Sequence, residues 1–249
     1  MSRSRRPAGR RFGLSIGGWL RTALGLALMP TAVLSVVALA RSFGDLAQAA
    51  AARDGALRGI GPFVAGFAGY AALHLLGIVR LSRLYVLGHE LTHAAAVWAG
   101  GGKVYRIVVA SDSGRVDLSH MSAFVALAPY WIPFYGLVVA GAYRLALWAG
   151  AAPGARGLFL ALMGAALSFH WMHTVRSLWV TRQSDLDQAG LALSLALIAL
   201  LNALVMLAAL KCLFPVSVSL AGRLRWVAGS SVHFWSGLGG LLQPAWGGP

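Results

Sequence analysis

Long apolar runs separated by short polar or basic links make up most of the chain. Most of these runs are close to or above 20 residues, the length of helix that crosses the hydrocarbon core of a bilayer. Pro129 and Pro133 interrupt one run and predict a kinked helix there. The runs are residues 20–40, about 59–79, 84–100, 121–148, 157–180 and about 189–210. The pattern therefore predicts an all-α polytopic membrane protein with about six transmembrane helices.

The two ends of the chain differ from this core. Residues 1–13 carry five arginines and are predicted to form a basic N-terminal tail. A secretory signal is an alternative, but run 20–40 is long enough to span and favours a retained first helix. Residues 215–249 are rich in glycine and tryptophan, and are predicted to be interfacial or disordered. Residues 14–214 between them form one membrane-embedded domain.

Composition supports the membrane assignment. The chain is 58% hydrophobic and 11% charged, with a mean hydropathy of +0.71, whereas a soluble domain carries about a quarter charged residues. Its net charge of +14 does not favour nucleic acid as a partner, because the arginines flank apolar runs. We expect them to meet lipid headgroups instead. Cys212 is the only cysteine, which excludes an internal disulfide and any cysteine-based metal site.

The run at 84–100 contains His-Glu-Leu-Thr-His. On a helix, His89 and His93 lie one turn apart on the same face, so both imidazoles can bind one metal ion. Glu90, the only glutamate in the chain, lies beside them as a general base for an activated water. The alternative is a buried polar cluster used for helix packing. Ionisable groups in apolar segments are costly, which favours the functional interpretation.

A β-hairpin is predicted directly after this helix. Glycines at 100–102 end the helix, and β-prone runs at 104–110 and 115–118 flank the turn sequence Asp112-Ser113-Gly114. Such a hairpin is either an edge to which an extended substrate adds as a further strand, or an exposed connection. The sequence leaves both open.

Asp185 and Asp187 are the best carboxylates to complete a metal site. The chain crosses away from the end of the HExxH helix through run 121–148 and returns through run 157–180. Both aspartates are therefore expected at that end, and His93 lies only about 10 Å from it at 1.5 Å per residue. Their alternative role is to cap the helix that follows.

Other polar residues within the apolar runs are candidates for supporting roles. His170 and His173 are three apart and share a helix face, so they are further ligands, stabilisers of a developing oxyanion, or interfacial residues. His74 is expected either to form a hydrogen bond with a neighbouring helix or to line the site, and Asn202 is expected to form a hydrogen bond across helices.

In these residues the chain resembles the site-2 protease family of intramembrane zinc metalloproteases, in its compact members without a PDZ domain. HELTH in an apolar helix, the glycine stop, the hairpin and an aspartate motif before a later helix carry the resemblance over about residues 84–210. It implies that His89, His93 and one aspartate bind Zn²⁺. It further implies that Glu90 activates water to cut a transmembrane protein substrate, in a multi-pass protein of the cell membrane.

Two features depart from the family pattern. The family has an Asn-x-x-Pro element and Leu-Asp-Gly at the third ligand, whereas here Leu-Asp at 186–187 is followed by glutamine. The string QSDLDQAG is more similar to a Gln-x-Asp variant and favours Asp185 over Asp187 as the ligand. His170 or His173 then replaces the missing asparagine as transition-state stabiliser.

Topology opposes part of this resemblance. The family's site opens to the cytosol, but counting five spans plus the metal helix puts the basic N-terminus on the other side of the membrane. That arrangement violates the positive-inside rule. One of the first two apolar segments then does not span, or the site faces outward.

The sequence thus predicts an intramembrane zinc metalloprotease. The alternatives are a catalytically inactive relative that acts as a membrane scaffold or binding protein, a transporter, and a zinc hydrolase of lipid. No inverted repeat favours the transporter, and the hairpin favours peptide over lipid.

Overall fold

The computed structural model describes residues 16–51, 60–111, 113–150, 154–180 and 184–242. The predicted basic tail at 1–13 lies outside the described residues, as do Asp112 of the predicted turn and positions 243–249. The elements are α1 (Ile16–Ala51), α2 (Ile60–Leu75), α3 (Ser82–Ala99), β1 (Val104–Val109), β2 (Gly114–Leu118), α4 (Ala123–Trp131), α5 (Phe134–Trp148), α6 (Ala155–Val180), α7 (Ser184–Ala189), α8 (Leu191–Leu213) and α9 (Leu220–Leu242).

Helices α1, α6 and α8 are long and apolar enough to cross a membrane, and the bent pair α4 and α5 makes a fourth candidate span. Helix α2 is apolar but has only 16 residues. Helix α3 does not qualify within the described part of the chain, because histidine, glutamate, serine and arginine lower its hydropathy. The protein is therefore mostly helical with three to four candidate spans, and the predicted six spans are not confirmed.

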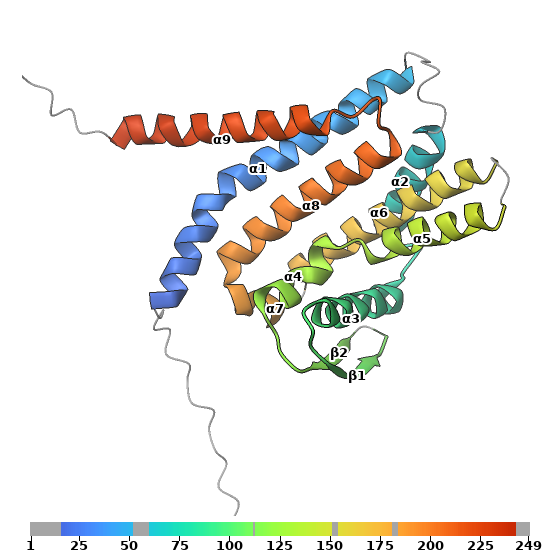
Figure 1. The fold of residues 1–249 in the computed structure, drawn as a ribbon, viewed down its shortest axis with the longest axis horizontal. Helices are drawn as coiled ribbons and strands as arrows, with labels where there is room; N and C mark the ends of the chain where they lie inside the picture. The colour runs from blue at the N-terminus through green and yellow to red at the C-terminus, as the bar shows by residue number, and fades with distance from the viewer. Residues whose placement is uncertain (1–15, 52–59, 112, 151–153, 181–183, 243–249) are drawn as a thin grey trace, which may run out of the picture.

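The predicted proline kink is confirmed between α4 and α5, which meet at 66°. Pro133 has no N–H, so it cannot bond to the carbonyl four residues earlier, and α4 ends at Trp131. Ile132 has extended backbone between the two helices. The kink thus turns the short α4 into the site region and sends α5 away from it (Figure 1).

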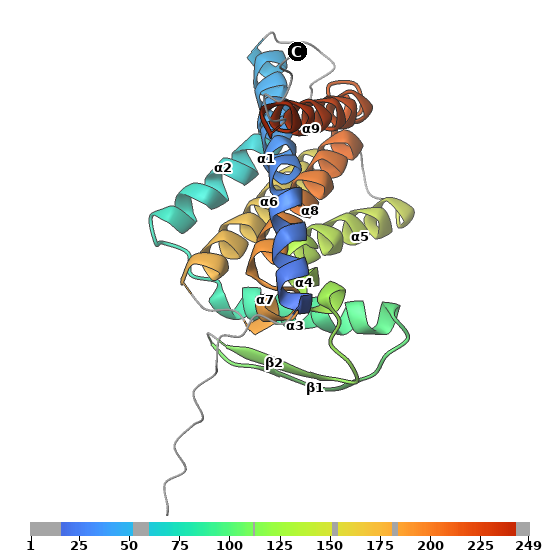
Figure 2. The same cartoon turned by 90° about the vertical axis from the view of Figure 1, so that its left-hand side faces the viewer.

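Two parallel helix pairs build the bundle. Helix α1 packs along α8, and α2 packs along α6, as Figures 1 and 2 show from two sides. Glycine permits this closeness: a Cβ on Gly25 would lie 2.4 Å from the backbone nitrogen of Leu193, and one on Gly66 would lie 1.9 Å from the carbonyl oxygen of Ala161. Apolar side chains fill the space between the pairs, including Leu39, Phe63 and Leu207.

Helix α3 lies across one end of this bundle, with the hairpin on its outer side (Figure 2). The start of α1 is at the same end, because Arg21 lies against Gly190, just before α8. The start of α1 and the HExxH helix α3 therefore lie at the same end of the bundle. Counting the HExxH helix as a sixth span puts the start of the chain and the motif on opposite sides. In the structure the start of α1 and α3 share one end, because α3 lies across the bundle.

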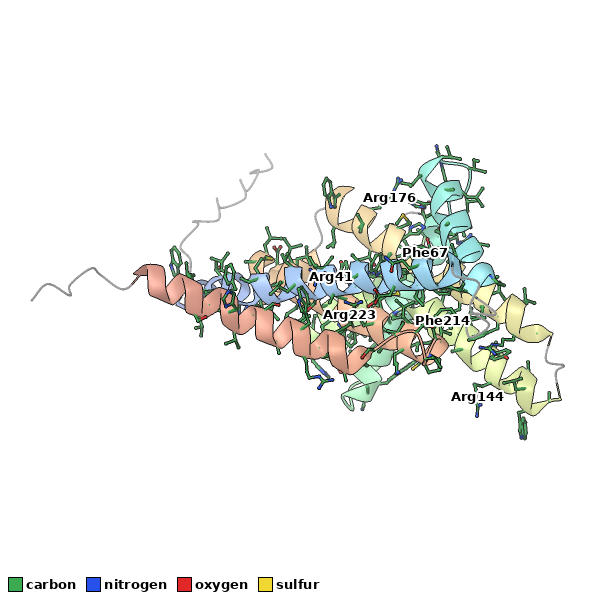
Figure 3. The ribbon with its side chains drawn as sticks, turned by 90° about the horizontal axis from the view of Figure 1, so that it is seen from above. Arg41, Phe67, Arg144, Arg176, Phe214 and Arg223 are labelled. Carbon is green, nitrogen blue, oxygen red and sulfur yellow. The ribbon has the colours of Figure 1, made fainter. Side chains whose placement is uncertain are left out.

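Strands β1 and β2 form the predicted antiparallel hairpin, with Val109 opposite Gly114 and an irregularity between Val104 and Arg106. At the other end of the bundle, residues 220–242 form α9, which crosses α1 (Figure 3). There Arg223 pairs with Asp45.

Candidate metal centre

Helix α3 presents the HExxH residues as the spacing predicts. His89 and His93 lie one turn apart with ring centroids separated by 4.8 Å. Alanine and leucine favour the helix, and Gly100 to Gly102 end it through backbone N–H groups that bond to carbonyls of its last turn. His93 is only 3% exposed, so its imidazole faces the protein interior.

Asp185 of α7 completes the group. Its Oδ2 lies 3.4 Å from Nε2 of His89 and 3.5 Å from Nε2 of His93. One ligand atom from each residue lies within 4.8 Å of the others, so the three side chains could hold a metal ion. Asp187 is exposed and does not belong to this group. The structure thus brings together the three residues that the sequence favoured.

The chemistry of these donors fits a metal ion. Nδ1 of His93 donates a hydrogen bond to the carbonyl oxygen of Val125 over 2.8 Å, which leaves Nε2 free to act as a ligand. Burial alone raises the pKa of the Asp185 carboxyl. The two imidazoles beside it outweigh burial and hold that pKa below its usual range. The carboxyl is therefore ionised at neutral pH, the form that coordinates a cation.

Glu90 is a residue of α3 whose side chain lies against the hairpin, and it is only 7% exposed. Gly114, the first residue of β2, covers it: a Cβ on Gly114 would lie 2.4 Å from Oε1 of Glu90 and 2.6 Å from Cγ1 of Val86. The hairpin backbone therefore packs directly on the glutamate. A glycine at this strand position keeps space for the carboxyl group.

His170 and His173 are buried on α6 but lie outside the metal-binding group. Nε2 of His170 donates to Oδ1 of Asn202 over 3.1 Å, so Asn202 forms the expected bond between helices. His173 is 3.1 Å from the hydroxyl of Tyr70 and packs against His74 with ring centroids 4.8 Å apart. The geometry therefore does not support either histidine as a further metal ligand.

A small hollow adjoins the centre on the side of His89. Its lining includes His170, Tyr85 and Phe169 from the surrounding helices and Ile132 and Phe134 from the kink. It has room for about one water molecule. Of the two predicted stabilisers, His170 therefore lines the same hollow as His89 of the candidate metal group.

The sequence interpretation missed the tyrosines around the centre. Tyr130 is fully buried, and its hydroxyl donates to Oδ2 of Asp185 over 3.1 Å. Tyr85 packs against both His89 and His173. The signal that could have found Tyr130 is its position in the APYWIP string, where a phenol lies between two prolines in an apolar run.

Comparison of the chain with protein-family models, with curated proteins and with solved structures finds no match. The functional interpretation therefore rests on the residues and their geometry.

Proposed function

We propose that this protein is an intramembrane zinc metalloprotease that hydrolyses peptide bonds in or near transmembrane segments of other membrane proteins. The observation that carries the proposal is the convergence of His89, His93 and Asp185 beside Glu90, at one end of an apolar helical bundle. Two histidines, one carboxylate and an adjacent glutamate are the donor set and general base of zinc hydrolases.

In this proposal the three side chains hold the zinc ion through two imidazole nitrogens and a carboxylate oxygen. When bound, zinc lowers the pKa of a water molecule and polarises the scissile carbonyl. Val125 fixes the orientation of His93 through its carbonyl oxygen. Burial of His93 and Glu90 keeps bulk water from the centre.

Glu90 acts as the general base and then as the general acid. Its carboxylate takes a proton from the attacking water as the oxygen bonds to the scissile carbonyl carbon. It then gives that proton to the amide nitrogen as the carbon–nitrogen bond breaks. The hairpin that packs on Glu90 supports a peptide substrate, because an extended peptide reaching the carboxyl would lie beside a strand.

We further propose that the end of the bundle that carries α3, α7 and the hairpin, here called the metal end, faces the cytosol. The five arginines of residues 1–13 directly precede α1 in the sequence, and α1 begins at this end, where α3 and the hairpin also carry basic residues. A cytosolic metal end therefore agrees with the positive-inside rule. We expect Tyr105→Cys, in a Cys212→Ser background, to react with a membrane-impermeant maleimide only after cells are opened. Tyr105 is 68% exposed on β1. Labelling in intact cells would place the site outside.

The decisive test combines zinc content with cleavage. The purified protein should contain one zinc per chain and should cleave single-span membrane reporter proteins in liposomes. Glu90→Gln should keep the zinc and lose about 100- to 10,000-fold in cleavage rate, the usual contribution of general acid–base catalysis. Cleavage by Glu90→Gln at the wild-type rate would exclude this role. A folded wild type without zinc would favour the scaffold alternative.

A further inference from the structure

Helix α4 contacts each member of the metal-binding group, although it supplies none of the three ligands. The carbonyl oxygen of Val125 accepts from His93. The ring of Tyr130 packs edge-on against the ring of His89, with centroids 5.2 Å apart at 86°. The hydroxyl of the same tyrosine donates to Asp185. One short helix before the proline kink therefore orients all three side chains.

Asp185 is the one member of the group that lies outside α3. It lies on α7, a helix of only six residues between positions 181–183 and Gly190. Helix α7 is held through Leu186, which packs in one apolar cluster with Tyr130 and whose carbonyl accepts from Ser194. These contacts hold the backbone, but they leave the carboxylate free to rotate about its last torsion.

The hydroxyl of Tyr130 acts on that torsion. It bonds to Oδ2, which is also the oxygen that lies 3.4 Å and 3.5 Å from the two histidines. A carboxylate held in this way presents one oxygen to the metal-binding position, so it loses little rotational entropy when a metal ion binds.

Tyr130 is itself held by two other helices. Its carbonyl oxygen accepts from Nδ2 of Asn202 over 2.6 Å, and Asn202 in turn accepts from His170. The side chain is fully buried. The phenol therefore occupies one position, as a group that orients a ligand must.

We propose that Tyr130 is a positioning residue for the metal centre, whose hydroxyl orients Asp185 as the third ligand. This inference rests on the proposed metal site. Tyr130→Phe keeps the ring that packs against His89 and removes only the hydroxyl. We expect its zinc affinity, measured by competition with a chelator, to fall about 10- to 100-fold, the usual effect of losing an outer-shell partner.

Tyr135→Phe is the matched control. Tyr135 lies beside the same hollow and donates to the carbonyl oxygen of Leu84 over 2.6 Å, but it does not contact Asp185. The Tyr135→Phe variant also loses one phenolic hydroxyl group, and its zinc affinity should equal that of the wild type. Thermal unfolding of the zinc-free proteins should show similar midpoints for both variants.

A double-variant cycle separates positioning from a general effect on structure. In an Asp185→Ala background, Tyr130→Phe should cause no further loss of zinc affinity, because the oriented group is absent. An additional loss of the full size would show that Tyr130 acts elsewhere. Asn202→Ala, which releases the carbonyl of Tyr130, provides a second variant and should lower zinc affinity less than Tyr130→Phe does.

The outcomes distinguish this inference from the proposed function. Zinc in the wild type with unchanged affinity in Tyr130→Phe and Asn202→Ala overturns the role of Tyr130 alone. A folded wild type that binds no zinc overturns the proposed function and this inference with it.

Discussion

The two ends of the helical bundle are built on different principles. At the metal end, the buried His93 and Tyr130 and the half-buried Asp185 are bonded to one another or to nearby backbone. At the opposite end, apolar side chains such as Phe63 and Leu210 fill the interior. The ion pair between Arg223 and Asp45 there lies near the surface, where the aspartate side chain is 53% exposed.

This difference implies that the apolar end mainly determines the stability of the bundle, whereas the metal end mainly determines its chemistry. Close apolar packing stabilises the bundle through many contacts that tolerate no added atoms. A buried polar network instead depends on each partner, because a group left without one keeps its full desolvation cost. We therefore expect substitutions at the metal end to change binding and turnover, and substitutions at the opposite end to change stability.

The largest effect is expected at Asp185. Asp185→Ala removes one of three ligands, so zinc affinity should fall by more than the roughly 100-fold upper range for outer-shell partners. Asp187→Ala is the matched control, because Asp187 is exposed on the same short helix. Zinc content of both purified variants measures the difference. Zinc lost from Asp187→Ala and retained by Asp185→Ala would reverse the ligand assignment.

Gly114→Ala tests the contact between the hairpin and Glu90. The φ of Gly114 lies outside the left-handed region, so alanine is strained only by the space it needs. The added Cβ should displace the carboxyl and lower the cleavage rate by about 100-fold, the effect of a misplacement of about 1 Å. Zinc content should not change. Ser113→Ala, at the adjacent exposed position, should cleave at the wild-type rate, and equal rates in both variants would refute the contact.

Gly66→Ala tests the apolar bundle. Its Cβ would overlap the carbonyl of Ala161 on α6, so we expect a loss of about 1–3 kcal/mol in stability from overpacking. In Gly69→Ala, on the same helix, the Cβ would meet nothing within 4 Å, and higher helix propensity should leave stability equal or slightly raised. Thermal unfolding in detergent compares them. A similar midpoint for both would argue against close contact between α2 and α6.

Local patterns predicted much of the candidate site. The spacing of His89 and His93 places them on one face of any helix, because the rise and turn of a helix are fixed. Turn residues predicted the hairpin, and Pro129 and Pro133 predicted the kink, since each signal acts within a few residues. The number of membrane crossings between the HExxH helix and α7 predicted that Asp185 lies at the same end of the bundle as His93.

Long-range packing decided the rest. The apolar residues around the motif predicted that α3 spans the membrane. In the structure this helix lies across the end of the bundle. Only the fold brings Tyr130 to Asp185, 55 positions further along the chain, and Gly114 to Glu90. Helical and turn preferences act between near neighbours, so the sequence itself determined the candidate histidines and the elements that carry the candidate ligands. Contacts between distant segments depend on how whole helices pack, and these contacts surround the candidate ligands and cover the glutamate.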